Sequence, residues 1–273
     1  MNVRIIGGLL LLSMSCFSAD VTLWVDDANG EIGKVDVTTG AVTLVGNSGR
    51  ILTDIAFDPN GNLFGIDQNN LYRINTTNGA ATVVGALNPA IPVVPSNIGD
   101  IPANSLVFSS GGTLYTATNQ LYTVDPNTGA DTRVGALGGT FISAGDLAFV
   151  NGTLFLSDTQ DRLLSVNPNT GVATLIGNMG VSNVFGLATP DNLTLYGVAG
   201  TSVYTLNPTN GSATLAVNFG GHGLGQAFGE AFISESSPTN PTPEPSSVLL
   251  VSAAALLLFG AKGLRRRISA RVY

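Results

Sequence analysis

Acidic side chains recur at one position of a repeated segment, and they are the residues of this chain best suited to chemistry. The position opens a short apolar stretch in each repeat, and its five occupants are Asp54, Ser105, Asp146, Gly186 and Gly229. Glu230 follows the last of them directly. If the repeats close into a ring, carboxylates from two repeats could face one another across its axis. A glycosidase or a metal site needs such an arrangement.

The alternative role for Asp54 and Asp146 is structural, as caps of loops that enter a strand. Glycine at two of the five positions favours this alternative. A hydrolase would use Asp54, Asp146 and Glu230, whereas the structural interpretation assigns no catalytic residue, and we adopt the latter. Three carboxylates converging on an open channel would favour the hydrolase. A channel plugged by apolar side chains would favour a binding protein.

A second polar column follows the next apolar stretch of each repeat. Its members are Asp26, Asp67, Thr118, Asp158 and Ala199. Each precedes a turn, so turn capping is the expected role. Calcium is the competing interpretation, but the chain has no Asp-x-Asp-x-Asp loop. We therefore predict no metal site.

Few other side chains could hold a cofactor or act as nucleophiles. His222 is the only histidine and Cys16 the only cysteine, which leaves no histidine-cluster zinc site and no disulfide in a chain processed after residue 19. The glycines around His222 are not followed by the lysine of a phosphate loop. We predict no cofactor. The recurring aromatic residues are expected to pack between repeats rather than to form a sugar platform; they are Trp24, Tyr72, Tyr122 and Tyr204.

Five segments share an Asp/Asn-x-x-x-Gly turn between two apolar runs, and they position these residues. Their terminal glycines are Gly40, Gly79, Gly129, Gly171 and Gly211. In such a turn the Asp or Asn side chain caps its own backbone, Pro presets φ, and Gly takes the left-handed conformation. Each segment is therefore predicted to be a β-hairpin.

A second hairpin precedes most of these segments, which gives four strands in about 40 residues, the size of a propeller blade. We predict an all-β fold, a five-bladed β-propeller over residues 20–234. The lone first strand at 229–232 would complete the blade that the N-terminus begins. The longest repeat carries an insertion over 88–103, which we expect near one mouth of the ring. A β-solenoid or a β-sandwich is the alternative.

Composition agrees with many short strands and excludes one class of partner. The chain is 44% hydrophobic and 11% charged, whereas about a quarter charged is ordinary for a soluble domain. All 18 acidic residues but only five basic ones lie between Asp20 and Pro245, so this part carries a net charge of −13. Such a surface repels phosphate backbones, and we predict no nucleic-acid binding.

Both ends have the pattern of membrane targeting. Residues 1–19 have the order of a secretory signal peptide: one arginine, an apolar run and small residues at the cleavage site. Residues 235–242 form a Ser/Thr/Pro linker. The tail 243–273 contains a Pro-Glu-Pro motif, a hydrophobic stretch predicted to be a helix over 248–259, and a basic cluster that would stop in the membrane. The motif is Pro243, Glu244 and Pro245, and the cluster is Lys262, Arg265, Arg266 and Arg267.

This ordered tail resembles the PEP-CTERM sorting signal of Gram-negative bacteria. The resemblance implies an exosortase-like processing enzyme as a partner, which cuts near the motif. It also implies an inner-membrane precursor that moves on to the periplasm, the cell surface or the medium. A simple single-span anchor is the alternative.

The expected function is that of an exported, non-catalytic surface propeller. Its expected partner is an exopolysaccharide or an envelope protein, with the membrane contacted through the tail before processing. A channel hydrolase and a purely structural matrix protein are the alternatives.

Overall fold

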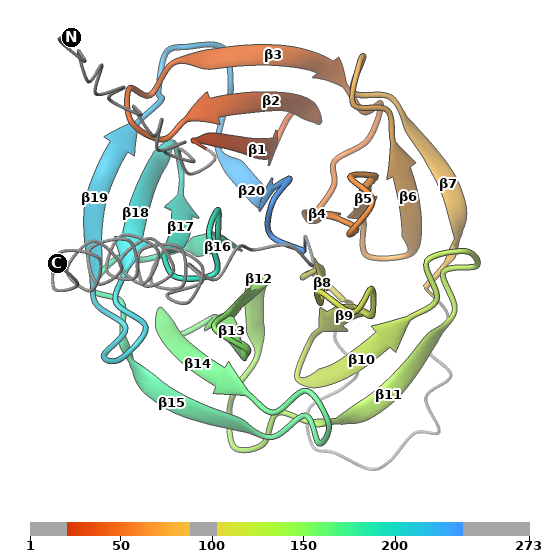
Figure 1. Cartoon of the computed structure of the whole chain (residues 1–273), viewed down its shortest axis with the longest axis vertical. Helices are drawn as coiled ribbons and strands as arrows, with labels where there is room; N and C mark the ends of the chain where they lie inside the picture. Colours follow the sequence, from red (N-terminus) through yellow and green to blue (C-terminus); the bar gives the residue numbers. More distant parts are fainter. Residues whose placement is uncertain (1–20, 88–102, 237–273) are drawn as a thin grey trace, which may run out of the picture. The chain divides into compact units, whose positions relative to one another are not determined.

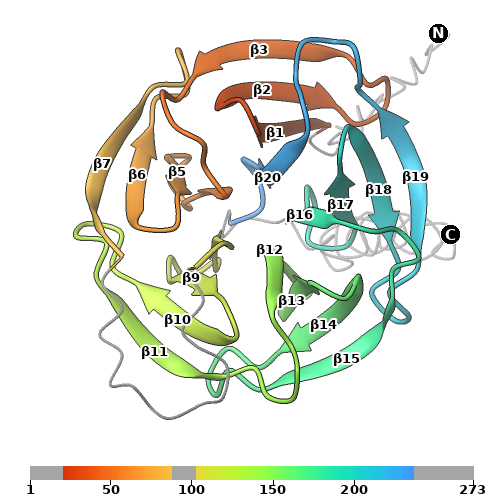
Figure 2. The same cartoon turned by 180° about the vertical axis from the view of Figure 1, so that it is seen from behind.

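The strands of the protein form a closed ring of five blades. The computed structural model describes residues 21–87 and 103–236, and the account that follows concerns these residues. Twenty strands make five four-stranded antiparallel sheets, which stand around a common axis (Figure 1) and close on themselves when seen from behind (Figure 2). The predicted all-β, five-bladed propeller is confirmed. The described ranges contain no helix, and therefore none that is long and apolar enough to cross a membrane.

Each blade is one up-and-down sheet, and we number the blades along the ring. Blade 1 contains β20 (Ala227–Phe232), β1 (Thr22–Asp27), β2 (Glu31–Asp36) and β3 (Val42–Asn47); blade 2 contains β4 (Asp54–Phe57), β5 (Leu63–Ile66), β6 (Asn70–Ile74) and β7 (Ala81–Ala86); blade 3 contains β8 (Val107–Phe108), β9 (Leu114–Ala117), β10 (Gln120–Val124) and β11 (Asp131–Ala136); blade 4 contains β12 (Ser143–Val150), β13 (Thr153–Asp158), β14 (Arg162–Val166) and β15 (Ala173–Asn178); blade 5 contains β16 (Val184–Ala188), β17 (Leu195–Ala199), β18 (Ser202–Leu206) and β19 (Ala213–Asn218).

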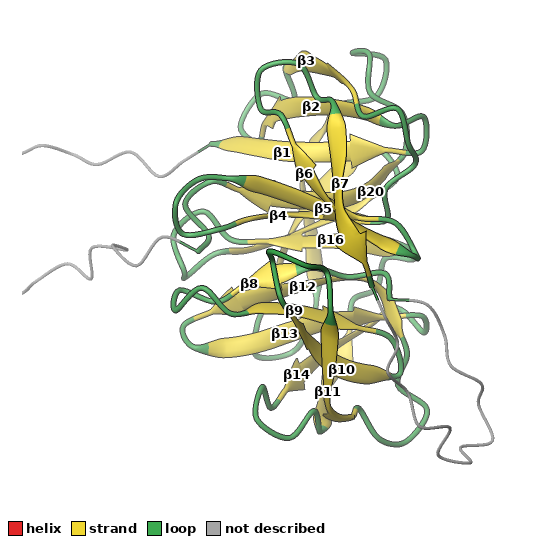
Figure 3. Ribbon diagram, turned by 90° about the vertical axis from the view of Figure 1, so that its right-hand side faces the viewer, coloured by secondary structure: helices red, strands yellow, loops and turns green. Residues whose placement is uncertain are grey.

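The first strand of every blade lies nearest the axis. These inner strands, β20, β4, β8, β12 and β16, contact one another in turn around the ring. The strands run between two faces of the ring, as the side view shows (Figure 3). We call the face at which the inner strands begin the entry face and the opposite one the exit face.

The ring closes by pairing the two ends of the described chain. β20 is antiparallel to β1, with Phe232 opposite Leu23 and Glu230 opposite Val25. The C-terminal strand thus supplies the inner strand of the blade that the N-terminus begins, as predicted. Because β1 begins where β20 ends, both ends of the described chain lie on the exit face.

The five repeated turns have the predicted chemistry. In each, an Asp or Asn side chain accepts the backbone N–H two residues further on, at 2.8 to 2.9 Å. The five acceptors are Asp36, Asn75, Asp125, Asn167 and Asn207. The glycine that ends each turn has a φ between 74° and 82°, which L residues rarely adopt.

A second glycine, in the outer strand, locks neighbouring blades together. A Cβ at this position would come within 3.0 Å of a backbone carbonyl oxygen in the turn of the next blade. The glycines and their partners are Gly46 and Asn78, Gly85 and Thr128, Gly135 and Thr170, and Gly177 and Asn210. At the fifth interface Val217 takes the glycine's place, beside Gly40 of blade 1. Backbone approach therefore sets the spacing of four interfaces.

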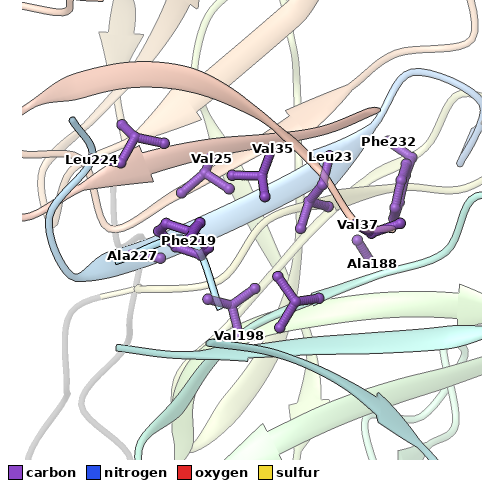
Figure 4. Close-up of a cluster of buried hydrophobic side chains, with 11 residues drawn as sticks. Leu23, Val25, Val35, Val37, Ala188, Val198, Phe219, Leu224, Ala227 and Phe232 are labelled. Atoms are coloured by element: carbon purple, nitrogen blue, oxygen red, sulfur yellow. The ribbon is translucent and has the colours of Figure 1, made fainter. Parts of the chain in front are cut away.

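The hydrophobic core is divided into five clusters, one between each pair of neighbouring blades. Figure 4 shows the cluster between blades 5 and 1, in which Leu23 and Phe232 of blade 1 lie with Val198 and Phe219 of blade 5. No blade buries its faces alone.

Aromatic packing at these interfaces agrees with the prediction for Trp24 and Tyr72. Trp24 packs edge-on against Phe57 of blade 2, with ring centroids 5.4 Å apart, and Tyr72 is fully buried in the same cluster. Trp24 lies on the second strand of its blade, whereas Tyr72, Tyr122 and Tyr204 lie on third strands. The tryptophan is therefore not the repeat equivalent of the tyrosines.

Several predicted segments lie outside the described residues. These are the signal peptide 1–19, most of the insertion over 88–103, nearly all of the linker 235–242, and the sorting tail 243–273.

Replacing Gly135 by Ala tests the lock between blades. Its Cβ would meet the Thr170 carbonyl, so the backbone must move, and we expect the free energy of unfolding to fall by about 1–3 kcal/mol. Gly111→Ala is the matched control, because a Cβ at Gly111 meets only Ser109 Oγ at 3.8 Å. Urea denaturation followed by circular dichroism measures both. Equal stability of the two variants would contradict the lock.

Candidate functional site

Two aspartates meet across the axis of the ring. Asp54 begins β4 in blade 2 and Asp146 lies in β12 of blade 4, and the Asp146 carboxyl donates a hydrogen bond to Asp54. Both side chains are fully buried. Burial raises the pKa of each carboxyl well above its usual value, because the ionised form loses its hydration; the negative charge of Asp54 raises the pKa of Asp146 further. The pair therefore shares a proton.

One oxygen of each aspartate, Oδ2, makes a hydrogen bond to a neighbouring blade. Asp54 Oδ2 accepts the N–H of Leu106 in the inner segment of blade 3, and Asp146 Oδ2 accepts the N–H of Leu187 in blade 5 at 2.6 Å. The Oδ1 atoms accept the N–H groups of the next residues in the chain, Ile55 at 2.7 Å and Leu147 at 2.5 Å. The sequence analysis predicted that these aspartates accept backbone N–H groups, and they do. It did not predict that each aspartate would join two blades.

Glu230 occupies a position that is aliphatic in every other blade. It follows Gly229 on β20, and the corresponding residues are Ile55, Leu106, Leu147 and Leu187. Its side chain is 1% exposed, and neither Oε1 nor Oε2 has a hydrogen-bond partner. Burial, reinforced by the charge of Asp26, raises its pKa well above the usual value. Burial therefore favours the protonated form of Glu230, at a position where the other blades have an aliphatic side chain.

Asp26 is the fourth carboxyl at the axis. It is fully buried on β1; its Oδ1 accepts the N–H of Gly229 at 3.1 Å, and its Oδ2 has no partner. Burial raises its pKa, and the charge of Asp27 adds to the effect. Asp26 and Glu230 both belong to blade 1, so the two incompletely paired acids lie in the blade that closes the ring.

Glycines make room for these carboxyls. A Cβ at Gly186 would lie within 3.0 Å of Glu230 Oε2, and one at Gly229 within 3.0 Å of Asp54 and Asp26. Two glycines in the first-strand column had favoured a purely structural column. The glycines do not support that inference, because they leave the space that the carboxyls of neighbouring strands occupy.

Turn capping is confirmed for Asp67, Thr118 and Asp158 of the second column, but not for Asp26, and Ala199 has no polar side chain that could cap a turn. Asp67 accepts the N–H groups of Asn69 and Asn70, and Asp158 accepts that of Gln160 and pairs with Arg162. In blade 1 the capping residue is Asp27, not Asp26. Of the other members of the column, Thr118 accepts the N–H of Gln120, and the last is Ala199. The prediction for Asp26 was wrong by one residue, because Asp26 faces Ile32 in the β1–β2 pair as Ile66 faces Leu71 in blade 2, which makes Asp27 the equivalent of Asp67.

The exit mouth of the channel is covered by the end of the described chain. Ser234 Oγ donates to the Pro190 carbonyl of blade 5 at 2.7 Å, and Ser236 Oγ donates to the Phe57 carbonyl of blade 2 at 2.6 Å. Between them Glu235 Oε1 is buried without a partner. Burial and the nearby Glu230 raise the pKa of Glu235. The axis is therefore closed to solvent from this side.

The acids at the axis do not form a metal centre. Within residues 21–87 and 103–236, no three His, Cys, Asp or Glu side chains have an arrangement that could hold a metal ion. His222 is exposed in the loop between β19 and β20, with its backbone N–H on the Phe219 carbonyl.

The entry mouth carries an accessible cavity of about 320 Å³. Its rim uses one repeat position from all five blades, the residue before the first-strand column: Thr53, Asn104, Gly145, Phe185 and Phe228. Ile51, Gln68 and Ala144 complete the lining. None of these side chains is titratable. The cavity therefore offers aromatic and amide groups, without charge.

Two features of the cavity define its character. The rings of Phe185 and Phe228 lie edge to face with centroids 6.1 Å apart, and Ile51 is 58% exposed. Asn104 donates from Nδ2 to the Ser143 carbonyl at 3.1 Å, while its buried Oδ1 has no partner. The sequence analysis did not predict this site, because it considered the column of acidic residues and not the residue that precedes each of them.

The variant Glu230→Gln tests whether burial favours the protonated form of this carboxyl. In the unfolded chain this carboxyl ionises near pH 4.3, about its free value, whereas its folded pKa is higher. The contribution of Glu230 to the free energy of unfolding is therefore fully present below pH 4. It is lost as the pH rises toward the pKa of Glu230 in the folded protein. At pH 8 we expect the variant to be more stable than the parent, by at least about 1 kcal/mol or 2–4 °C in melting temperature.

The matched control is Glu31→Gln on β2, where the side chain accepts from Asn47 Nδ2 at 3.0 Å in an exposed pair. Melting curves from pH 4 to pH 9 should show a flatter profile only for the Glu230 variant. A Glu230→Gln protein that melts below the parent at pH 8 would show that the carboxylate is ionised and paired.

Known proteins share the fold at low identity. A chain of the nidogen/laminin complex is 13% identical, with a TM-score of 0.53, over 79% of this chain and 99% of that one. A protein of unknown function from Bacteroides thetaiotaomicron is 13% identical, with a TM-score of 0.50, over 81% and 66%. A gluconolactonase from Xanthomonas campestris is 14% identical, with a TM-score of 0.47, over 77% and 80%.

No curated protein matches the sequence. A family model does match, described as a repeat of unknown function, DUF6923. The match runs over residues 54–219, from the first residue of β4 to the residue after β19, and so covers blades 2 to 5. Blade 1, with the two incompletely paired acids, lies outside it. The chain belongs to the DUF6923 repeat family.

Proposed function

We propose that this protein is an exported, non-catalytic surface propeller that binds an exopolysaccharide at the entry mouth of its channel. One observation carries the proposal: the acids are sealed at the axis, while the accessible hollow above them has aromatic and amide groups and no titratable side chain. A site of that kind can bind a ligand but has no group to transfer a proton to it.

The channel hydrolase is the second candidate, and it would use Asp54, Asp146 and Glu230. These carboxyls do converge, as that hypothesis requires. However, all three are buried, and each oxygen of Asp54 and Asp146 already accepts a backbone N–H. A glycosidase needs one carboxylate free to attack or to activate water. The geometry therefore favours binding.

The lining of the entry mouth fits a neutral sugar segment. Sugar rings have apolar C–H faces that pack on aromatic rings, which Phe185 and Phe228 provide. Their hydroxyls need amide or hydroxyl partners, which Gln68, Asn104 and Thr53 provide. An envelope protein that inserts an aliphatic side chain, or a purely structural role in the matrix, is the competing interpretation.

Export and sorting rest on the two ends of the sequence. The signal peptide 1–19 would bring the chain through the inner membrane, and the tail 243–273 would hold it there until an exosortase-like enzyme cuts near Pro243-Glu244-Pro245. The mature propeller would then reach the cell surface or the medium.

Phe228→Ala tests the binding site. Loss of this ring should weaken binding to the purified exopolysaccharide of the native host about tenfold, or 1.4 kcal/mol, measured by affinity electrophoresis. Phe149→Ala is the matched control, because Phe149 is also half-buried in an edge-to-face aromatic pair, with Tyr115 at 5.7 Å, and does not line the mouth.

Two results would contradict the proposal. One is equal binding by both variants. The other is release of reducing ends from the polysaccharide that Asp54→Asn abolishes, which would establish the hydrolase instead.

The tail is tested by mass spectrometry of the mature protein from the native host. If the tail is removed during sorting, the C-terminus should lie near residues 243–247, and peptides beyond Lys262 should be missing. In a host without the processing enzyme, the full-length chain should stay in the inner membrane. A mature surface protein that retains residues 265–273 would identify the tail as a simple anchor.

A further inference from the structure

A second hollow lies between blades 2 and 3 on the exit face. It has a volume of about 510 Å³ and shares no residue with the entry mouth. Its walls are the turns that follow β4, β8 and β10, together with Arg73 on β6. We call it the blade 2–3 groove. The turn after an inner strand lies where that strand ends, which places the groove on the face opposite the entry mouth.

Arg73 is the cation of this groove, and an aromatic ring holds it in place. It lies directly across from Phe64 in the β5–β6 pair, and its guanidinium lies 4.6 Å from the centroid of that ring. Phe64 is buried and packs on Phe108 of blade 3, with centroids 5.2 Å apart. A guanidinium stacked in this way keeps its N–H edge directed to solvent.

No carboxylate of the described residues pairs with Arg73. The ion pair between Arg162 and Asp158 is the one that residues 21–87 and 103–236 contain. Asp58 lines the groove, but its oxygens accept from the N–H of Asn60, the N–H of Asn62 and Asn62 Nδ2, at 2.8 to 2.9 Å. Against the effect of its partial burial, these hydrogen bonds from Asn62 and Asn60 and the charge of Arg73 lower the pKa of the Asp58 carboxyl. The guanidinium nevertheless forms no ion pair with the described residues and keeps its N–H donors for a ligand.

The other groups of the groove suit hydroxyl-rich ligands. Asn60 and Ser110 are exposed, and their side chains make no hydrogen bond with the described part of the chain. Gly111 leaves the wall between them open, since a Cβ there would meet only Ser109 Oγ at 3.8 Å. The groove thus holds one cation, one carboxylate whose oxygens its own turn already satisfies, and neutral amides and hydroxyls. Arg73 is its one group that can pair with a carboxylate, and the amides and hydroxyls suit the hydroxyls of the same ligand.

We propose that the blade 2–3 groove binds an acidic saccharide, with a uronic acid carboxylate on Arg73 and neighbouring sugar hydroxyls on Asn60 and Ser110. A free phosphate or carboxylate ion would fill little of the cavity. A densely charged polyanion would be repelled by the net negative charge of the domain, so isolated uronic acids within a largely neutral chain fit best. The inference goes beyond the proposed function, because it assigns a second site with a charged specificity.

Two trisaccharides of equal length test the site on the protein isolated from its native host. One is glucuronosyl-xylobiose, with a single carboxylate; the other is xylotriose, which is neutral. Titration calorimetry should show the acidic sugar binding at least tenfold more tightly. Arg73→Gln should remove that preference, and raising the salt concentration should weaken only the acidic sugar.

Lys34→Gln is the matched control. Lys34 lies opposite Trp24 in blade 1, 4.4 Å from its ring, at the repeat position that Arg73 occupies in blade 2. It does not line the groove, so its loss should leave the affinity unchanged. Melting curves check that both variants fold.

The outcomes separate this proposal from the entry-mouth proposal. Phe228→Ala should bind glucuronosyl-xylobiose as the parent does, and Arg73→Gln should keep its affinity for neutral polysaccharide. Equal affinity for both trisaccharides, an equal loss in Lys34→Gln and Arg73→Gln, or tighter binding of a triglutamate peptide than of the acidic sugar would each overturn the groove proposal while leaving the entry mouth untouched.

Discussion

The pairing of β20 with β1 is the interaction on which the rest of the structure depends. Each blade buries apolar residues against its neighbours, and the two clusters that flank blade 1 include residues of β20. Without β20, blade 1 would lose its inner strand, and the cluster with blade 5 would lose Ala227 and Phe232. Closure also pairs the edge of β1 that would otherwise lie open.

The acids at the axis divide into two kinds with different energetic roles. Asp54 and Asp146 are satisfied by backbone N–H groups and share a proton, so they act as ties between blades 2 and 3 and between blades 4 and 5. Asp26 and Glu230 keep oxygens without partners. A buried polar group without a hydrogen bond reduces stability. The closing blade thus buries two acids with incompletely paired oxygens, and burial raises the pKa of both.

The two proposed sites lie on opposite faces of the ring, on either side of the buried acids at its axis. The entry mouth combines Phe185 and Phe228 with amides and no charge, whereas the groove on the opposite face adds the single cation Arg73. The two proposed sites differ in chemistry as well as in position. A polysaccharide with neutral stretches and occasional acids could engage both, and binding through two weak sites would gain from avidity.

The sequence alone determined much of the fold. The recurring turn, in which Asn or Asp precedes a glycine, predicts the hairpins, and each side chain does cap its own backbone. The spacing of the turns predicts five blades, and the orphan strand at 229–232 predicts the closure. These features are local, since a turn depends on residues that are neighbours in the chain and a blade is one such unit repeated.

The site was decided by tertiary structure. Asp54 and Asp146 were recognisable as candidates, but their shared proton and their bonds to blades 3 and 5 depend on groups up to 52 residues away. The entry mouth joins one residue from each blade, and Phe228 reaches it only through the closure. Asp26 is the equivalent of Ile66 rather than of Asp67, and it is buried because β20 covers blade 1 from the axis side. Chain order fixes which residues can cap a turn, whereas burial, and with it the ionisation of an acid, is set by strands that meet only when the ring closes.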